Sequence, residues 1–195
     1  HGDVHLGNIL VDSGGAVRIV DFGLARPIPP LRLPGRVAVG GVLRYHAPEQ
    51  AAALLAGRAM PAPTTRSEQY ALAVTLFHLV TGKFPIVESL DRRTLLESIA
   101  NRAPASFPPS SIAPWPELES ILNRALARDP ANRFDSLDAL AAALDALPEP
   151  TRQRPPASLG RSAGRELAGI VDSFVARVAI DSAAFRKPLR APQAP

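Results

Sequence analysis

The chain has 195 residues, of which 46% are hydrophobic and 21% charged, and its formal net charge at pH 7 is +4. These fractions are typical of an ordinary globular domain with enough apolar residues to form a core. The chain has no cysteine, which excludes disulfide bonds, thiolate metal sites and cysteine nucleophiles and agrees with a cytoplasmic protein. Its longest apolar stretch, residues 70–80, is too short to span a bilayer, so we expect no membrane segment in this chain.

The first predicted element is a β-hairpin near the N-terminus. Two short apolar runs, residues 9–11 and 17–20, flank a turn that contains glycine, as the two strands of a hairpin do. The hairpin would bring Asn8, before the first strand, next to Asp21, after the second. Their oxygens, together with the carboxylate of Asp3, suit Mg²⁺ and a phosphate-bearing substrate. The pattern therefore favours phosphoryl transfer.

After the hairpin the sequence predicts mainly helices, so the expected fold class is α+β. The expected helices cover residues 68–79, 91–102, 116–126 and 137–147, and each is rich in apolar residues. Gly82 would follow the first of them as a left-handed cap. Asp135 or Ser136 would cap the last one.

Composition and charge divide the chain at about residue 147. Residues 1–147 carry 14 basic and 14 acidic side chains, whereas residues 148–195 carry 8 and 4. Prolines over residues 148–156 predict a stiff linker, and apolar residues recur at helical spacing over residues 167–178. We expect one domain over 1–147 and a Pro-rich linker with an amphipathic helical tail over 148–195. The basic surplus is small, so we expect no nucleic-acid partner.

Several motifs, in this order, resemble the protein kinase-like family. His-Gly-Asp-Val-His-Leu-Gly-Asn over residues 1–8 is similar to the family's catalytic loop, and Asp-Phe-Gly at residues 21–23 to its metal-binding segment. Residues 45–49 are similar to the end of the activation segment, residues 68–82 to the central helix and residues 125–134 to the segment before the last helix. The resemblance implies a kinase-like C-terminal lobe over residues 1–147, with a small β-hairpin at the catalytic loop, from a bacterial Ser/Thr protein kinase.

The resemblance also implies roles for individual residues of the site. Asp3 would accept the proton of the attacking hydroxyl, and Asn8 and Asp21 would hold Mg²⁺ and, through it, ATP. His5 stands where the family usually has a lysine that steadies the transferred phosphate, and we count it as a catalytic candidate. His46, beside Tyr45, is expected to line the substrate platform.

Three further residues would have structural roles in such a lobe. Glu49 and Arg133 would form an ion pair that holds the substrate platform, and removing one of them would leave a partly buried charge. Glu68 replaces an aspartate that braces the catalytic-loop backbone. Val42 replaces a threonine whose hydroxyl usually contacts the catalytic aspartate.

The ATP-binding lobe of the family precedes the catalytic loop, whereas this sequence starts on that loop. The two lysines, Lys83 and Lys187, both follow Asp21, so neither can serve as the lysine of that lobe. We therefore expect the chain to be a fragment whose partner in cis is an N-terminal kinase lobe, and we expect no ATP turnover by these 195 residues alone.

Three functions are compatible with these residues. A Ser/Thr protein kinase acting on a protein substrate is favoured by Glu49 and Arg133. A small-molecule phosphotransferase of the same superfamily is favoured by Gly2 and His5. A pseudokinase-like binding module is favoured by His5 and Val42, although the intact carboxylates and amide of the metal site argue against it.

Residues 24–44 contain no Ser, Thr or Tyr, and Gly2 replaces an arginine that usually meets a phosphate on this segment. We therefore predict that phosphorylation of this segment does not control activity. Phosphatase treatment of the protein that contains this chain should leave its transfer rate unchanged. A phosphate mapped between Asp21 and Glu49 and required for activity would contradict the prediction.

Overall fold

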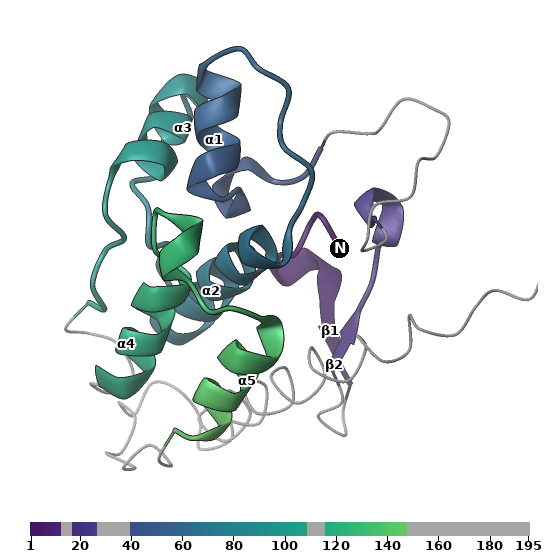
Figure 1. Cartoon of the computed structure of the whole chain (residues 1–195), viewed down its shortest axis with the longest axis vertical. Coiled ribbons are helices and arrows are strands. Elements are labelled where there is room, and N and C mark those ends of the chain that lie inside the picture. The colour runs from purple at the N-terminus through teal and green to yellow at the C-terminus, as the bar shows by residue number, and fades with distance from the viewer. Residues whose placement is uncertain (13–16, 27–39, 109–115, 148–195) are drawn as a thin grey trace, which may run out of the picture.

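The structure is a computed structural model that describes residues 1–12, 17–26, 40–108 and 116–147. Its strands are β1 (Ile9–Val11) and β2 (Val17–Ile19), and its α-helices are α1 (Pro48–Leu55), α2 (Thr65–Thr81), α3 (Arg92–Asn101), α4 (Pro116–Ala125) and α5 (Leu137–Asp145). Short 3-10 turns cover Leu6–Asn8, Phe22–Leu24, Leu43–Tyr45 and Pro130–Asn132. The helices gather in one body, and the hairpin lies along one side of it (Figure 1). The fold is α+β and mainly helical, as predicted; the predicted tail helix lies outside the described residues.

The β-hairpin forms where the sequence predicts it. Its strands are antiparallel, with Ile9 opposite Ile19, and the Val20 N–H donates to the Asn8 carbonyl at 2.9 Å. This last bond extends the pairing by one residue beyond the strands. Asn8 therefore lies beside the residue that precedes Asp21, as expected from the apolar runs.

Helix α2 forms the centre of the core and contacts α4 and α5. Its residues from Gln69 to Phe77 are all buried. The helix begins three residues before the predicted start because the Thr64 hydroxyl accepts from the Ser67 N–H at 3.1 Å and caps its first turn. It ends at Gly82, whose φ of +66° is the predicted left-handed cap. Among the described residues, no helix combines the length and the apolar character needed to cross a bilayer.

The three later helices agree with the sequence analysis to within a few residues. Asp91 caps α3, and Ser136, not Asp135, caps α5 through a bond from the Ala139 N–H. Leu126 follows the end of α4 but remains 1% exposed. Helix α5 ends at Asp145, two residues before the predicted end.

Helix α1 was not predicted from the sequence. It begins with Pro48 at its first position, where the missing N–H costs nothing. The Gln50 side chain accepts from the Ala47 N–H at 2.9 Å and closes the first turn. Helix α1 packs on α3 and forms a second apolar cluster with it. That cluster contains Ala51, Leu96, Ile99 and Ala100.

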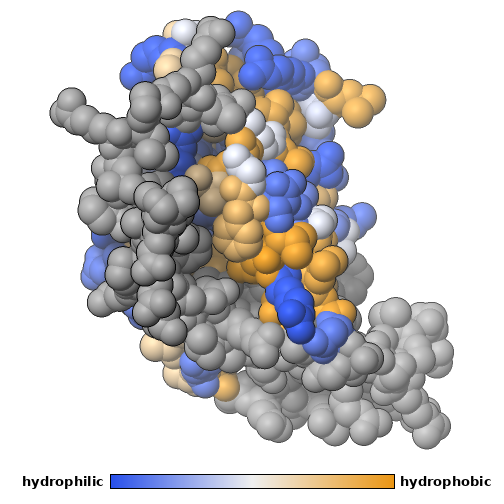
Figure 2. All heavy atoms as spheres, turned by 90° about the vertical axis from the view of Figure 1, so that its right-hand side faces the viewer, coloured by the Kyte–Doolittle hydropathy of each residue, from blue (hydrophilic) through white to orange (hydrophobic). Residues whose placement is uncertain are grey.

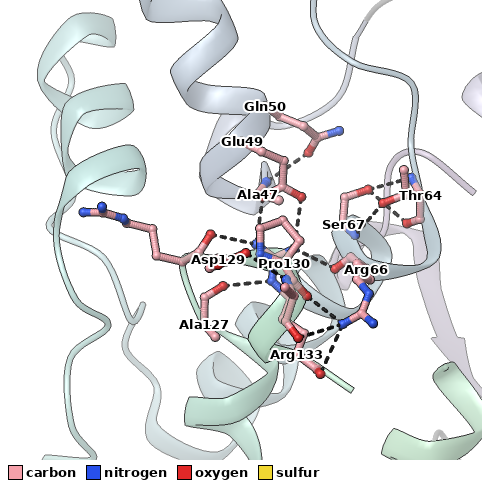
Figure 3. Close-up of polar contacts among 12 residues, drawn as sticks. Ala47, Glu49, Gln50, Thr64, Arg66, Ser67, Ala127, Asp129, Pro130 and Arg133 are labelled. Carbon is pink, nitrogen blue, oxygen red and sulfur yellow. Dashed lines mark hydrogen bonds and ion pairs between the residues drawn. The ribbon is translucent and has the colours of Figure 1, made fainter. Parts of the chain in front are cut away.

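A buried arginine joins the start of α1 to the rest of the helical body (Figure 3). The Arg133 side chain is 0% exposed, and its two terminal nitrogens donate to the Glu49 carboxylate at 3.0 and 2.8 Å. The same guanidinium donates to the Arg66 carbonyl at 2.8 Å and to the Ala127 carbonyl at 2.8 Å. The predicted ion pair is therefore present, and its hydrogen bonds connect α1, the start of α2 and the segment between α4 and α5.

Breaking this ion pair should destabilise the fold strongly. Arg133→Met keeps the length of the side chain but leaves Glu49 without its partner, which should lower the free energy of unfolding by about 3–5 kcal/mol. The matched control is Arg93→Met, which removes an exposed pair with Glu97 (79% and 47% exposed) and should cost about 0.5 kcal/mol or less. Urea denaturation of the three proteins measures both changes. An equal decrease in the free energy of unfolding for Arg133→Met and Arg93→Met would contradict the prediction.

Candidate functional site

The carboxylate of Asp3 is held by donors from three directions. Its Oδ1 accepts from the Val42 N–H at 3.2 Å. Its Oδ2 lies 3.5 Å from the Asn8 amide nitrogen and 3.5 Å from the His5 Nε2. The predicted catalytic residue is half-buried, and these contacts fix the direction of its carboxylate. The contact with Val42 also ties the catalytic loop to a segment that is distant in the sequence.

Asn8 is oriented by the main chain of the same loop. Its amide nitrogen donates to the Asp3 carbonyl at 2.9 Å, and the side chain is buried at 8% exposure. No hydrogen bond from a described residue reaches its amide oxygen. Because the nitrogen is engaged, the oxygen is the atom available to a hard cation.

Asp21 has a left-handed backbone, with φ of 61° and ψ of 72°. Among the described residues it is the one non-glycine residue with a positive φ. Its Oδ1 accepts from the Gly23 N–H at 3.2 Å, a local bond that Asp can make in this conformation. Such strain costs of the order of 1–3 kcal/mol and is typical of functional sites.

A metal ion at this site would need ligands of more than one kind. The part of the chain that the structure describes contains no group of three or more His, Cys, Asp or Glu side chains able to hold a metal. Asn8 and Asp21 offer one amide oxygen and one carboxylate from adjacent strand ends. That donor set fits Mg²⁺, which usually takes one or two carboxylates and completes its shell with water and substrate phosphates.

His5 has a structural contact that the sequence did not indicate. It precedes the turn Leu6–Asn8, and its Nδ1 accepts from the Gly7 N–H at 3.0 Å. An accepting Nδ1 carries no proton, so the ring proton lies on Nε2, which faces Asp3. In this arrangement His5 offers a neutral donor and not the fixed positive charge of a lysine.

The backbone of the catalytic loop is braced by Glu68 and His1. Both carboxylate oxygens of Glu68 lie 3.2 Å from the Gly2 nitrogen, and His1 Nε2 bonds the Val20 carbonyl at 3.0 Å. Gly2 has a φ of +83°, and a Cβ there would lie 2.8 Å from the Leu24 carbonyl oxygen. The backbone itself therefore requires glycine at position 2, a reason that sequence patterns do not reveal.

His46 follows the 3-10 turn Leu43–Tyr45, four residues after Val42, whose N–H contacts Asp3. It is only 7% exposed, so it does not lie on the surface of a substrate platform, where the sequence analysis expected it. Burial lowers the pKa of His46 below its ordinary value of 6.5, although the Val42 main chain and the charge of Asp3 act in the opposite direction.

Comparison with known proteins identifies relatives of this chain. The family model described as protein kinase domain matches residues 1–144. The chain is 30% identical over 142 residues to the serine/threonine-protein kinase PrkC of Bacillus subtilis, covering 73% of this chain and 21% of that protein. It is 33% identical over 189 residues to the serine/threonine-protein kinase PknA of Mycobacterium tuberculosis, covering 94% of this chain and 40% of that protein. The chain thus spans less than half the length of these curated relatives.

A solved structure gives the same result for the fold. The kinase PK-1 of the Cydia pomonella granulovirus matches with a TM-score of 0.53 and 19% sequence identity, over 72% of this chain and 48% of that one. At this identity the likeness concerns the fold alone. The fold is that of a kinase.

The lowered pKa of His46 predicts how stability changes with pH. The native state keeps this ring neutral at a pH at which the unfolded chain already binds a proton, so its contribution is present above pH 6.5 and is lost as the pH falls towards the lowered native value. Urea unfolding at a series of pH values should show a steeper loss below pH 6.5 for the wild type than for His46→Leu. Identical slopes for the two proteins would contradict this.

Proposed function

This chain belongs to the protein kinase family, and from this premise we propose that the protein containing it transfers a phosphoryl group from ATP to a Ser or Thr hydroxyl of a protein. The observation that carries the proposal is the contact between the Asp3 carboxylate and the Val42 N–H at 3.2 Å. It joins the proton acceptor to the segment that leads directly into α1. Asp3 is thereby connected by a hydrogen bond to the segment before α1, which would bind the polypeptide substrate.

In this mechanism Asp3 orients the attacking hydroxyl and accepts its proton. Oδ1 of Asp3 accepts a hydrogen bond from the Val42 N–H at 3.2 Å. Oδ2 has only the longer contacts, at 3.5 Å, with the Asn8 amide nitrogen and the His5 Nε2. Oδ2 is therefore the oxygen better able to take a proton. A positioned general base of this kind accelerates a reaction by about 10²–10⁴-fold.

The protein kinase family uses ATP and a divalent metal, and we infer that Asn8 and Asp21 hold Mg²⁺ in this protein. When bound, Mg²⁺ would neutralise the negative charge on the β- and γ-phosphates. Asn8 would offer its amide oxygen and Asp21 its carboxylate, held in place by the bond from the Gly23 N–H. His5, whose Nε2 faces the Asp3 carboxylate at 3.5 Å, would act on that carboxylate.

Two features favour a protein substrate over a small molecule. Helix α1 is fixed to the helical body by the pair of the buried Arg133 and the partly buried Glu49, which gives an extended substrate a rigid surface. Gly2, which by sequence favoured a small-molecule phosphotransferase, is required here by its φ of +83° and by the nearby Leu24 carbonyl. Glycine at position 2 is therefore explained by the backbone and no longer supports a small-molecule substrate.

The pseudokinase-like alternative is weakened by the contact at position 42. Val42 lacks the hydroxyl of a threonine, but its own N–H reaches Asp3. The loss of the hydroxyl therefore leaves the carboxylate oriented. A protein that only bound a partner would have no use for this orientation together with the strained backbone of Asp21.

We propose that the partner in cis is an N-terminal kinase lobe that covers the hairpin side of the molecule. Viewed from that side, apolar side chains gather on the surface (Figure 2). Leu10 and Val11 in β1 and Phe22 just after β2 are 52%, 39% and 48% exposed. Large apolar side chains this exposed are typical of a face that another part of the protein covers. The enzyme would act in the cytoplasm, where ATP is available.

The assignment is tested on the protein that contains this chain, with labelled ATP and separate protein and small-alcohol substrates. Asp3→Asn keeps the shape of the side chain but removes the base, and should lower kcat by about 10²–10⁴-fold. Asp21→Ala should abolish transfer, since the metal loses its carboxylate. Labelling of small alcohols and not of protein would move the assignment to a small-molecule phosphotransferase.

The matched control for these variants is Asp138→Asn, which changes an exposed aspartate in the first turn of α5. It should keep the wild-type rate. Wild-type protein that labels no substrate, while Asp21→Ala still binds the same partners, would support the binding module instead.

A further inference from the structure

We propose that Gly7 is a positioning residue that holds His5 as a neutral N–H donor towards the Asp3 carboxylate. The inference rests on the proposed function, because Asp3 is the proton acceptor of that reaction. Gly7 acts through the ring of His5 and takes no part in the proton transfer itself. Its effect is to fix which ring nitrogen carries the proton and in which direction that N–H points.

The first support is a hydrogen bond from the Gly7 main chain to the His5 ring. The Gly7 N–H donates to His5 Nδ1 at 3.0 Å, at the start of the 3-10 turn Leu6–Asn8. The hydrogen bond that one ring nitrogen makes decides which nitrogen is protonated. Because Nδ1 accepts, its lone pair is engaged and the single proton of the neutral ring lies on Nε2. The bond from Gly7 therefore selects one of the two neutral forms of the ring.

The second support is the position of the other ring nitrogen. His5 Nε2 lies 3.5 Å from Asp3 Oδ2, and each of the two side chains is 18% exposed. With the proton on Nε2, an N–H faces the negative carboxylate, whereas with the proton on Nδ1 a lone pair would face it. In that second form Nε2 would also be a base, and it would compete with Asp3 for the proton of the hydroxyl. The bond from Gly7 thus leaves Asp3 as the proton acceptor.

The third support is that neither burial nor backbone conformation requires glycine at position 7. The residue is exposed, and it is not among the described glycines that have a positive φ. A Cβ there would lie 2.9 Å from His5 Cε1 and 3.1 Å from His5 Nδ1. Cβ atoms essentially never approach another atom to below 3.0 Å. Any other residue at position 7 would therefore displace the ring.

The ring of His5 also has an aromatic neighbour that limits its movement. The centroids of the His5 and Tyr45 rings are 5.6 Å apart, and Tyr45 packs edge-on against Phe84 at 5.8 Å. Phe84 in turn stacks on His78 of α2 at 4.1 Å. This row of rings joins the catalytic loop to the central helix. A displaced His5 ring would change its contact with Tyr45, with Asp3 or with both.

These contacts make a double-mutant cycle the sharpest test. Gly7→Ala keeps the N–H at position 7 but places a methyl group against the His5 ring. If Gly7 acts through the ring, this methyl group lowers the rate when His5 is present and is harmless in His5→Ala, which leaves room for it. If glycine is needed only for the turn, Gly7→Ala costs the same in both backgrounds.

The experiment uses the full-length protein that contains this chain and measures kcat and KM for ATP with a protein substrate. Gly7→Ala should lower kcat about 10- to 100-fold, because a small misplacement of a group beside the reacting atoms is enough for such a loss. KM for ATP should change less than about twofold, because the ring is not part of the proposed metal site. Added to His5→Ala, the same substitution should change kcat less than about twofold.

The matched control is Gly57→Ala, which adds the same methyl group after α1, where nothing lies within 4 Å of a Cβ. Gly57 has a φ of +65°, so this variant also strains the backbone, and its kcat should still equal that of the wild type. A wild-type kcat in Gly7→Ala would overturn the inference. An equal loss with and without the His5 ring, in protein that circular dichroism shows to be folded, would overturn it too.

A second measurement does not depend on activity. In ¹⁵N-labelled full-length protein, an N–H···N hydrogen bond gives a scalar coupling between the Gly7 amide nitrogen and His5 Nδ1. The ¹⁵N shifts of the two ring nitrogens, identified by their loss in His5→Ala, show which one is protonated. We expect the coupling and a proton on Nε2; an absent coupling or a proton on Nδ1 would overturn the inference. If both are found but the wild type transfers no phosphate, the proposed function fails while the assignment of the ring proton by Gly7 stands.

Discussion

The guanidinium of Arg133 holds together three segments that are far apart in the sequence. It has no solvent contact and donates to Glu49, to Arg66 and to Ala127. A buried charge is tolerated only when it is paired and its donors are satisfied. The start of α1 therefore cannot move independently of α2 or of the segment before α5, and everything that α1 positions depends on this interaction.

The candidate site depends on that anchor through a short stretch of main chain. Gln50, in the first turn of α1, binds the Ala47 N–H, and the residues just before Ala47 include His46 and Val42. Because α1 is fixed, this stretch approaches the catalytic loop in one orientation and donates to Asp3. The Asp3 carboxylate thus takes its direction from packing between helices as well as from its own loop.

The site also stores strain that its local contacts offset. Asp21 has a positive φ, which costs of the order of 1–3 kcal/mol, while its bond from Gly23 and the pairing of Val20 with Asn8 hold it there. A carboxylate kept in such a conformation, directly after the residue that pairs with Asn8, is suited to a ligand with fixed geometry. This favours metal–nucleotide binding over a surface that only contacts a protein.

Local sequence by itself determined the hairpin, the cap at Gly82 and the order of the motifs, because these depend on spacing and on single residues, whereas it left the cap of α5 open between Asp135 and Ser136. It missed α1, and it expected His46 to line the substrate platform, whereas that side chain is 7% exposed. It also could not show that Gly2 is required by the neighbouring Leu24 carbonyl. Only the tertiary structure decided these points, because the burial of a polar side chain and the room beside a backbone atom depend on which distant segments meet.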